Sequence, residues 1–245
     1  MMSLLPLLKG VLQPAVDYAL PPRCPGCGAI VGADFAFCLS CWGGMEFLGE
    51  PCCARCGVPF PHDLGDGAEC GACLADPPPW DSARAVLAYG DVARTVALRL
   101  KYGRRIGLAR LIARQMLRHV GDGEAVIMPV PLHRWRLWHR GFNQSALIAD
   151  HLARLTGWPL EKRALRRVKR TSPLRGMTPR QRAKTVRGAF VLADGHGLNG
   201  RPVLLIDDVH TSGATAAACV RVLKRGGAGP VRLLCWARVL PDAAD

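Results

Sequence analysis

The sequence predicts an α/β domain with a mostly parallel sheet and flanking helices, preceded by a small cysteine-rich module. From residue 81 onwards, strand-like and helix-like patterns alternate, which is typical of parallel sheets covered by helices. Nine of the 11 cysteines fall between residues 24 and 73, in a segment with few large apolar residues. The 245 residues suffice for one full domain and one small module.

The two parts also differ in charge. Residues 1–80 carry 3 Lys and Arg against 8 Asp and Glu, whereas residues 81–245 carry 30 against 11. We therefore expect the second part to meet polyanions such as phosphates, nucleic acid or acidic lipid. A basic surface without a partner is the alternative.

The N-terminal segment, residues 1–20, is apolar but is interrupted by Pro6, Lys9 and Pro14. It lacks the basic start and the cleavage site of a signal peptide, so we expect a cytoplasmic protein. We predict that the segment forms an amphipathic helix that docks on a neighbouring surface; a weak membrane contact is the alternative. The sequence contains no uncharged apolar stretch of about 18 residues, so we expect no transmembrane helix.

Eight of the cysteines form four Cys-x-x-Cys pairs. A tight turn, with Gly permitting its geometry, lets the two thiolates of a pair point at one metal ion. We expect two structural zinc sites in a double zinc ribbon over residues 21–77, because four thiolates close the coordination shell. Without a secretion signal, disulfides are disfavoured. The expected ligands are Cys24, Cys27, Cys38, Cys41, Cys53, Cys56, Cys70 and Cys73.

The spacing favours pairing in chain order, since ten residues separate the first two pairs and thirteen separate the last two. A crossed pairing stays open at this point. Cys52 is surplus, and Cys219 and Cys235 lie in apolar contexts typical of small buried side chains.

A stiff proline-rich linker, residues 76–80, separates the cysteine module from the domain expected over residues 80–240. In this domain the apolar run 202–206 is typical of a central parallel strand. The expected strands are 83–89, 125–130, 165–168, 202–206 and 231–239, and the expected helices are 91–101, 108–119, 143–155 and 214–224.

A phosphate-binding loop is predicted directly after the strand 202–206. Ligands of open α/β sheets bind at the carboxyl ends of the strands, and backbone N–H groups at a helix N-terminus bind phosphate. Two carboxylates repel a second phosphate but accept hydrogen bonds from ribose hydroxyls. The residues therefore predict a site for a phosphorylated ribose, made of Asp207, Asp208, Thr211, Ser212, Gly213, Ala214 and Thr215.

A hydrophobic strand followed by Asp-Asp and Thr-Ser-Gly-x-Thr resembles the signature with which type I phosphoribosyltransferases bind 5-phosphoribosyl 1-pyrophosphate (PRPP). Further short motifs lie at 129–132, 140–144 and 187–190. With the cysteine module, the layout resembles the ComF family of competence-associated, phosphoribosyltransferase-like proteins over nearly the whole chain.

This resemblance implies specific roles. Asp207 and Asp208 would hold the ribose hydroxyls as the catalytic pair, and Mg²⁺ would arrive with PRPP. It also implies a link to DNA uptake, with a competence helicase as a partner. The implied contacts to pyrophosphate or to the acceptor are Lys101, Arg140, Asn143 and Gln144.

A strongly basic segment, residues 162–187, holds 11 Lys and Arg and no Asp or Glu, and residues 133–140 interleave tryptophan with charge. Such interleaving is typical of single-stranded nucleic-acid binding. The alternative is that the tryptophans are half-buried and the arginines serve only the phosphates of PRPP. The histidines of 133–140 are expected to be solvated. The nucleic-acid candidates are Arg134, Trp135, Arg136, Trp138, Arg166, Arg167, Lys169 and Arg170.

Two functions therefore stay open. One is an enzyme that transfers phosphoribose to a nitrogen nucleophile, with pyrophosphate leaving. The other is a non-catalytic, nucleotide-regulated protein that binds single-stranded DNA. No general base can be identified from the sequence.

Overall fold

The structure is a computed structural model that describes residues 21–171 and 176–240. The amphipathic helix expected over residues 1–20 lies outside the described residues.

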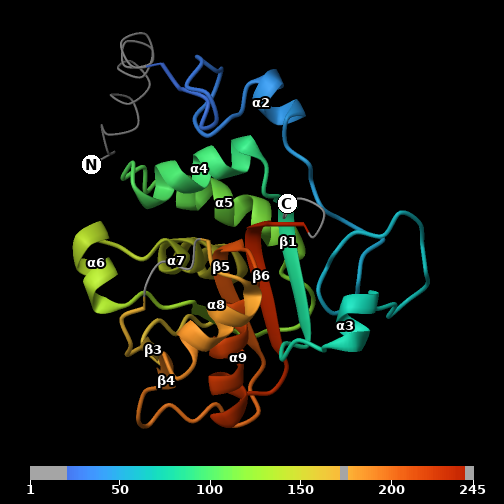
Figure 1. Ribbon diagram of the computed structural model, residues 1–245. Helices are drawn as coiled ribbons and strands as arrows, with labels where there is room; N and C mark the ends of the chain where they lie inside the picture. The colour runs from blue at the N-terminus through green and yellow to red at the C-terminus, as the bar shows by residue number, and fades with distance from the viewer. Residues whose placement is uncertain (1–20, 172–175, 241–245) are drawn as a thin grey trace, which may run out of the picture.

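The main sheet has four parallel strands in the order β1-β6-β5-β2 (Figure 1). Because all four strands are parallel, their carboxyl ends meet at one edge of the sheet. The bounds of the strands are β1 (Ser82–Ala88), β2 (Val126–Pro129), β5 (Val203–His210) and β6 (Val231–Arg238).

Helices cover both faces of this sheet, as the alternating pattern predicts. One face packs against α4 (Asp91–Lys101), α5 (Leu108–Met116) and α7 (Gln144–Thr156). The other face packs against α9 (Ala214–Arg225) and a small antiparallel sheet. That small sheet pairs β3 (Leu165–Arg167) with β4 (Phe190–Leu192).

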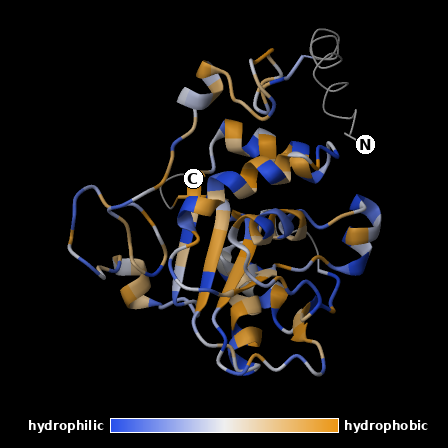
Figure 2. Cartoon of the chain, turned by 180° about the vertical axis from the view of Figure 1, so that it is seen from behind, coloured by the Kyte–Doolittle hydropathy of each residue, from blue (hydrophilic) through white to orange (hydrophobic). Residues whose placement is uncertain are grey.

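The apolar strands are buried on both sides, because alternate residues enter the two cores. In β5, Leu204 and Ile206 pack on the α7 side, whereas Val203 and Leu205 pack on the α9 side. Figure 2 shows the hydrophobic colour along the central strands, between helices that carry hydrophilic residues.

The cysteine-rich module forms two ribbons around two short helices, α2 (Leu39–Gly43) and α3 (Gly71–Ala75). The ribbon with α2 lies beyond α4, and the ribbon with α3 lies beside β1 (Figure 1). A hydrogen bond connects the first ribbon to α4, since Arg99 Nη1 donates to the Pro25 carbonyl at 2.6 Å.

The structure contains elements that the sequence did not predict, among them the strand β4 and the short helices α2 and α3. The helices α6 (Arg134–Arg140) and α8 (Pro179–Val186) were not predicted, because both are short and strongly basic. The predicted helix 108–119 ends in a 3-10 turn, η1 (Leu117–His119).

A further difference concerns the site itself. We expected the strand to end at residue 206, before the aspartates, and this is wrong. β5 continues to His210, because β6 runs alongside and keeps pairing with it up to the partners His210 and Arg238. The aspartates therefore project from a fixed strand and not from a loop.

Candidate functional site

Two four-cysteine groups in the ribbons have the geometry of zinc sites. Within each group, the four sulfur atoms lie within 4.8 Å of one another. Tetrahedral Zn²⁺ with bonds of about 2.3 Å separates its sulfur ligands by about 3.8 Å. The Cys27 and Cys38 sulfurs lie 3.6 Å apart, and the Cys56 and Cys70 sulfurs lie 3.7 Å apart. The groups follow chain order: Cys24, Cys27, Cys38 and Cys41 form the first, and Cys53, Cys56, Cys70 and Cys73 form the second.

Backbone N–H groups prepare one thiol in each group to bind a cation. Burial by itself raises the pKa of Cys24 and of Cys53, but N–H groups that point at these sulfurs lower each pKa to about 6. For Cys53 the donors are the amides of Cys56 at 3.4 Å and Cys70 at 3.2 Å. The donor set suits zinc, so the predicted pair of structural zinc sites is confirmed in its chain-order form.

A second cluster lies where β5 reaches the carboxyl edge of the sheet. Its centre is Asp208, whose carboxylate is almost fully buried. Lys101 Nζ, from the end of α4, lies 2.7 Å from Asp208 Oδ2, and Gln144 Nε2, from the start of α7, lies 3.4 Å from Oδ1. Three elements far apart in the chain thus meet at one carboxylate.

Arg140, the last residue of α6, extends this cluster. Its guanidinium donates to Gln144 Oε1 and lies 5.1 Å from the centre of the Tyr102 ring. Two cations, Lys101 and Arg140, therefore lie near the aspartate pair. This cationic edge suits a ligand with more than one phosphate.

Asn143, the fourth predicted contact to pyrophosphate or to the acceptor, has a different role from Lys101, Arg140 and Gln144. Its Nδ2 donates to the Val130 carbonyl at 3.0 Å, and its Oδ1 accepts from the Ser145 N–H as the N-cap of α7. Both ends of the amide are engaged within the chain, so Asn143 fixes the start of α7 against the end of β2.

Asp207 lies beside Asp208 and has its own partners. Its Oδ1 accepts from Ser145 Oγ and from the Asp208 N–H, each at 3.0 Å. Burial and the neighbouring Asp208 carboxylate raise the pKa of Asp207 to about 7, although Lys101 and the two hydrogen bonds oppose the rise. A carboxyl group that titrates near neutral pH is typical of functional sites.

The predicted phosphate loop follows immediately. Thr211 and Ser212 are exposed, and Gly213 is the N-cap of α9 in a left-handed conformation, with φ 71°. No side chain caps the first turn of α9. Its first N–H groups can therefore bind an anion, and the helix dipole favours negative charge there.

Ser145 is a residue of the cluster that escaped the sequence-based prediction. Ser145 follows the motif at 140–144 directly, and one residue further along the same motif would have identified it. Tyr102 lies in a short motif, residues 101–103, that the family resemblance places near the site, but its contact with Arg140 depends on how α4 and α6 approach each other.

The basic and aromatic candidates form a separate surface on and beside α6. Trp138 is 76% exposed and Trp135 is 45% exposed, and their rings meet edge to face at 5.9 Å. The Arg170 guanidinium lies 5.0 Å from the centre of the Trp135 ring. A pocket of about 430 Å³ lies here, lined among the described residues by Arg134, Trp135 and Trp138.

The remaining basic candidates divide by exposure. Arg166, Lys169 and Arg170 are exposed, whereas Arg136 and Arg167 are partly buried. Arg167 lies against the Phe190 ring and bonds to Thr171, so it serves the fold of the small sheet.

One expectation for this surface is wrong, because His133 is not solvated. It is buried as the N-cap of α6, where its Nδ1 accepts from the Trp135 N–H. Burial and the surrounding arginines lower its pKa. His139 is exposed, as expected.

Comparison with known proteins places the chain in a family. Residues 15–74 match the family described as "Double zinc ribbon domain". The chain is 32% identical to "DNA utilization protein YhgH" of Escherichia coli O157:H7, over 77% of this chain and 84% of that protein. It is 29% identical to "Competence protein F" of Haemophilus influenzae, over 82% and 96% respectively. The chain belongs to the ComF family.

Another ComF relative, "Competence protein ComFC" of Bacillus subtilis, is 27% identical over 81% of this chain and 82% of that protein. Among solved structures, an adenine phosphoribosyltransferase is 16% identical, with a TM-score of 0.38, over 58% of this chain and 75% of that chain.

The fold class predicted for this ComF protein is confirmed by its parallel sheet, its flanking helices and its two ribbons. In the described part of the chain, no helix combines the length and the apolar character needed to cross a bilayer.

Proposed function

We propose that this ComF protein binds PRPP at the carboxyl edge of its sheet, with the 5-phosphate on the loop 211–215. One observation carries the proposal: the uncapped N-terminus of α9 follows an aspartate pair that Lys101 of α4 contacts directly and that Gln144 links to Arg140 of α6. Such a site offers N–H donors for a phosphate, acceptors for ribose hydroxyls, and positive charge for a diphosphate.

In this proposal, Asp207 and Asp208 accept hydrogen bonds from the ribose, and Lys101 and Arg140 face the pyrophosphate. Mg²⁺ fits as a companion of PRPP, since the described site offers only two carboxylates and Mg²⁺ is usually held by one or two carboxylates together with substrate phosphates. The relatives named for competence and DNA utilization support a role in the handling of DNA taken up by the cell.

If the site is catalytic, its chain residues position PRPP and stabilise the departing diphosphate, which are the main sources of rate in such transfers. The bond from the ribose C1 to the pyrophosphate oxygen breaks, and a bond from C1 to an acceptor nitrogen forms. The nitrogen nucleophile loses its proton to solvent.

Replacing both aspartates is expected to abolish PRPP binding. Hydrogen bonds to a charged group are worth about 1.5–3 kcal/mol each, so Asp207→Asn with Asp208→Asn should weaken binding at least about 100-fold. Isothermal titration with PRPP and Mg²⁺ measures the effect. The exposed Asp194→Asn serves as the matched control and should bind as the parent protein does.

PRPP binding that persists in the double variant would contradict this site, as would a parent protein that does not bind PRPP. A panel of bases, scored for pyrophosphate release, then decides between transfer and binding. Binding without release for any base would favour the non-catalytic function.

A second function, single-stranded DNA binding, is favoured by the exposed tryptophans of α6. Base stacking on an aromatic ring is worth about 1–3 kcal/mol, and basic surfaces bind nucleic acid with a steep salt dependence. Trp138→Ala is therefore expected to weaken single-strand binding about tenfold or more, measured by fluorescence anisotropy over a range of salt concentrations.

The control for this variant is Leu137→Ala, because Leu137 is an exposed neighbour on the same helix without a ring. It should leave the affinity unchanged. A flat salt profile, or equal losses in the two variants, would count against a stacking surface on α6.

A further inference from the structure

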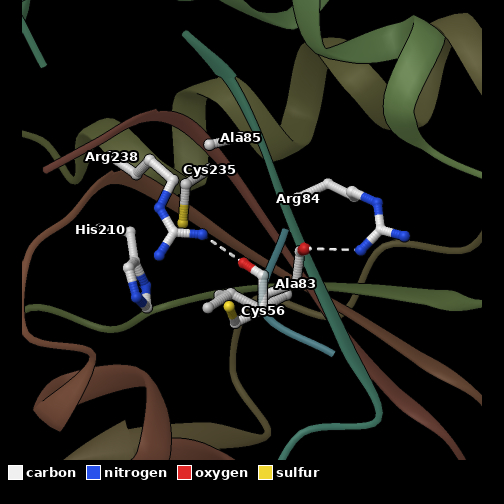
Figure 3. A pocket seen from close by; sticks show the side chains of 8 residues that line it. Cys56, Ala83, Arg84, Ala85, His210, Cys235 and Arg238 are labelled. Atoms are coloured by element: carbon white, nitrogen blue, oxygen red, sulfur yellow. Dashed lines mark hydrogen bonds between the residues drawn. The ribbon is translucent and has the colours of Figure 1, made fainter. Parts of the chain in front are cut away.

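The second zinc ribbon is hydrogen-bonded to the strands that lead to the phosphate loop. The guanidinium of Arg238, the last residue of β6, donates to the carbonyl of Cys56, a ligand of the second zinc site. Figure 3 shows this guanidinium between His210 and Cys56. His210 is the register partner of Arg238 and the last residue of β5. The loop 211–215 begins at the next residue.

Two neighbouring carbonyls of the same cysteine turn are also held by the sheet. The Arg55 carbonyl accepts from the Ala83 N–H at 2.8 Å, and the Ala54 carbonyl accepts from Arg84 Nη1 at 3.0 Å. Three successive carbonyls, those of residues 54, 55 and 56, are thus fixed by β1 and β6. The position of this zinc-binding turn depends on the sheet, and the sheet edge depends on the turn.

Close packing continues from this turn to the loop. The rings of Trp80 and His210 meet edge to face at 5.5 Å. A Cβ atom on Gly213 would lie 2.9 Å from Trp80 Cη2 and 3.0 Å from His210 Cε1. The loop therefore closes directly against these two rings, with no room for a side chain.

The positive charge of Arg238 is buried. It is only 7% exposed, and among the described residues it has no carboxylate within salt-bridge distance. A buried charge without compensation is costly. A centre of four thiolates and one Zn²⁺ carries about two net negative charges. With zinc bound, the second site would therefore supply the counter-charge that Arg238 lacks.

We propose that the zinc at the second site, acting through Arg238, His210 and Trp80, holds the phosphate loop in its binding shape. These three are positioning residues. The inference deepens the proposed function, because it concerns the same loop. The first ribbon is bonded to α4 through Arg99, and none of its hydrogen bonds between described residues reaches 211–215.

Hydrogen–deuterium exchange of the zinc-loaded full chain tests this coupling without any ligand. Arg238→Met is expected to raise exchange of the amides of 211–215 at least about tenfold, while β2 and α7 exchange as in the parent. One of the two zinc ions should also pass faster to a chelator. The matched variant Arg99→Met, which cuts the corresponding bond of the first ribbon, should release the other zinc faster and leave the loop unchanged.

Arg238→Lys separates charge from hydrogen bonding. It keeps a cation next to the zinc centre, so zinc retention should recover relative to Arg238→Met. Unchanged loop exchange in Arg238→Met would overturn the proposal, and so would equal opening of the loop in Arg99→Met.

If Arg238→Met does not fold, Trp80→Phe decides, since it shortens the ring against Gly213 and leaves the zinc ligands alone. It should speed loop exchange with both zinc ions retained, and unchanged exchange would overturn the proposal. Because exchange is measured without PRPP, a failure of PRPP binding in the parent protein is a separate result.

Discussion

Replacing Cys53 by Ser is expected to lower the zinc content from about two to about one ion per chain and to unfold the second ribbon. The core of this ribbon consists largely of its own ligands: Cys53, Cys56 and Cys73 are its buried members, with Val58, Phe60 and Cys70 packed against them. Structural zinc contributes about 10–16 kcal/mol to the folding of small zinc domains, far more than such a core can supply.

The neighbouring Cys52 provides the matched control. It is half-buried and belongs to neither four-cysteine group, so Cys52→Ser should keep about two zinc ions. Elemental analysis gives the zinc content, and limited proteolysis between residues 53 and 73 reports unfolding. Two zinc ions in the Cys53 variant, or one in the Cys52 variant, would refute the ligand assignment.

The single variant Asp207→Asn is expected to stabilise the fold at pH 8. Burial and the Asp208 charge raise the pKa of Asp207 to about 7, from an ordinary value of 3.8. The folded chain therefore binds this proton more tightly than the unfolded chain. The stability that protonation contributes is complete below about pH 4 and is lost as the pH rises to about 7.

Asparagine removes this loss, because it stays neutral and still accepts the hydrogen bond from Ser145. Since one pKa unit corresponds to about 1.4 kcal/mol, the gain at pH 8 is up to about 4 kcal/mol, and it should vanish near pH 4. Urea unfolding at several pH values measures it as a difference between variant and parent, in which zinc release at low pH cancels. The exposed Asp194→Asn should show no such gain.

A variant that is less stable than its parent at pH 8 would show that the Asp207 carboxylate is well accommodated in the fold. The expected result, a gain in stability with a loss of PRPP affinity, is typical of residues kept for binding at the expense of the fold.

The sequence alone determined the features that depend on neighbours along the chain. Paired cysteines at a spacing of three define a metal-binding turn, so all eight zinc ligands were identified before the structure. Apolar periodicity likewise gave the helix Asp91–Lys101 with its observed bounds. The turn of small residues after the aspartates predicted a helix that starts at residue 214, and α9 begins at Ala214 with Gly213 as its N-cap.

Tertiary structure alone decided which distant residues meet. Lys101 and Asp208 are 107 positions apart and pair only because the fold brings the end of α4 to the end of β5. The strand β5 extends beyond its apolar residues because β6 supplies hydrogen-bond partners up to Arg238. The contact of Arg238 with Cys56 likewise depends on how the second ribbon docks on β1. Spacing and turn chemistry act over a few residues, whereas these contacts depend on packing between whole elements, which no local pattern encodes.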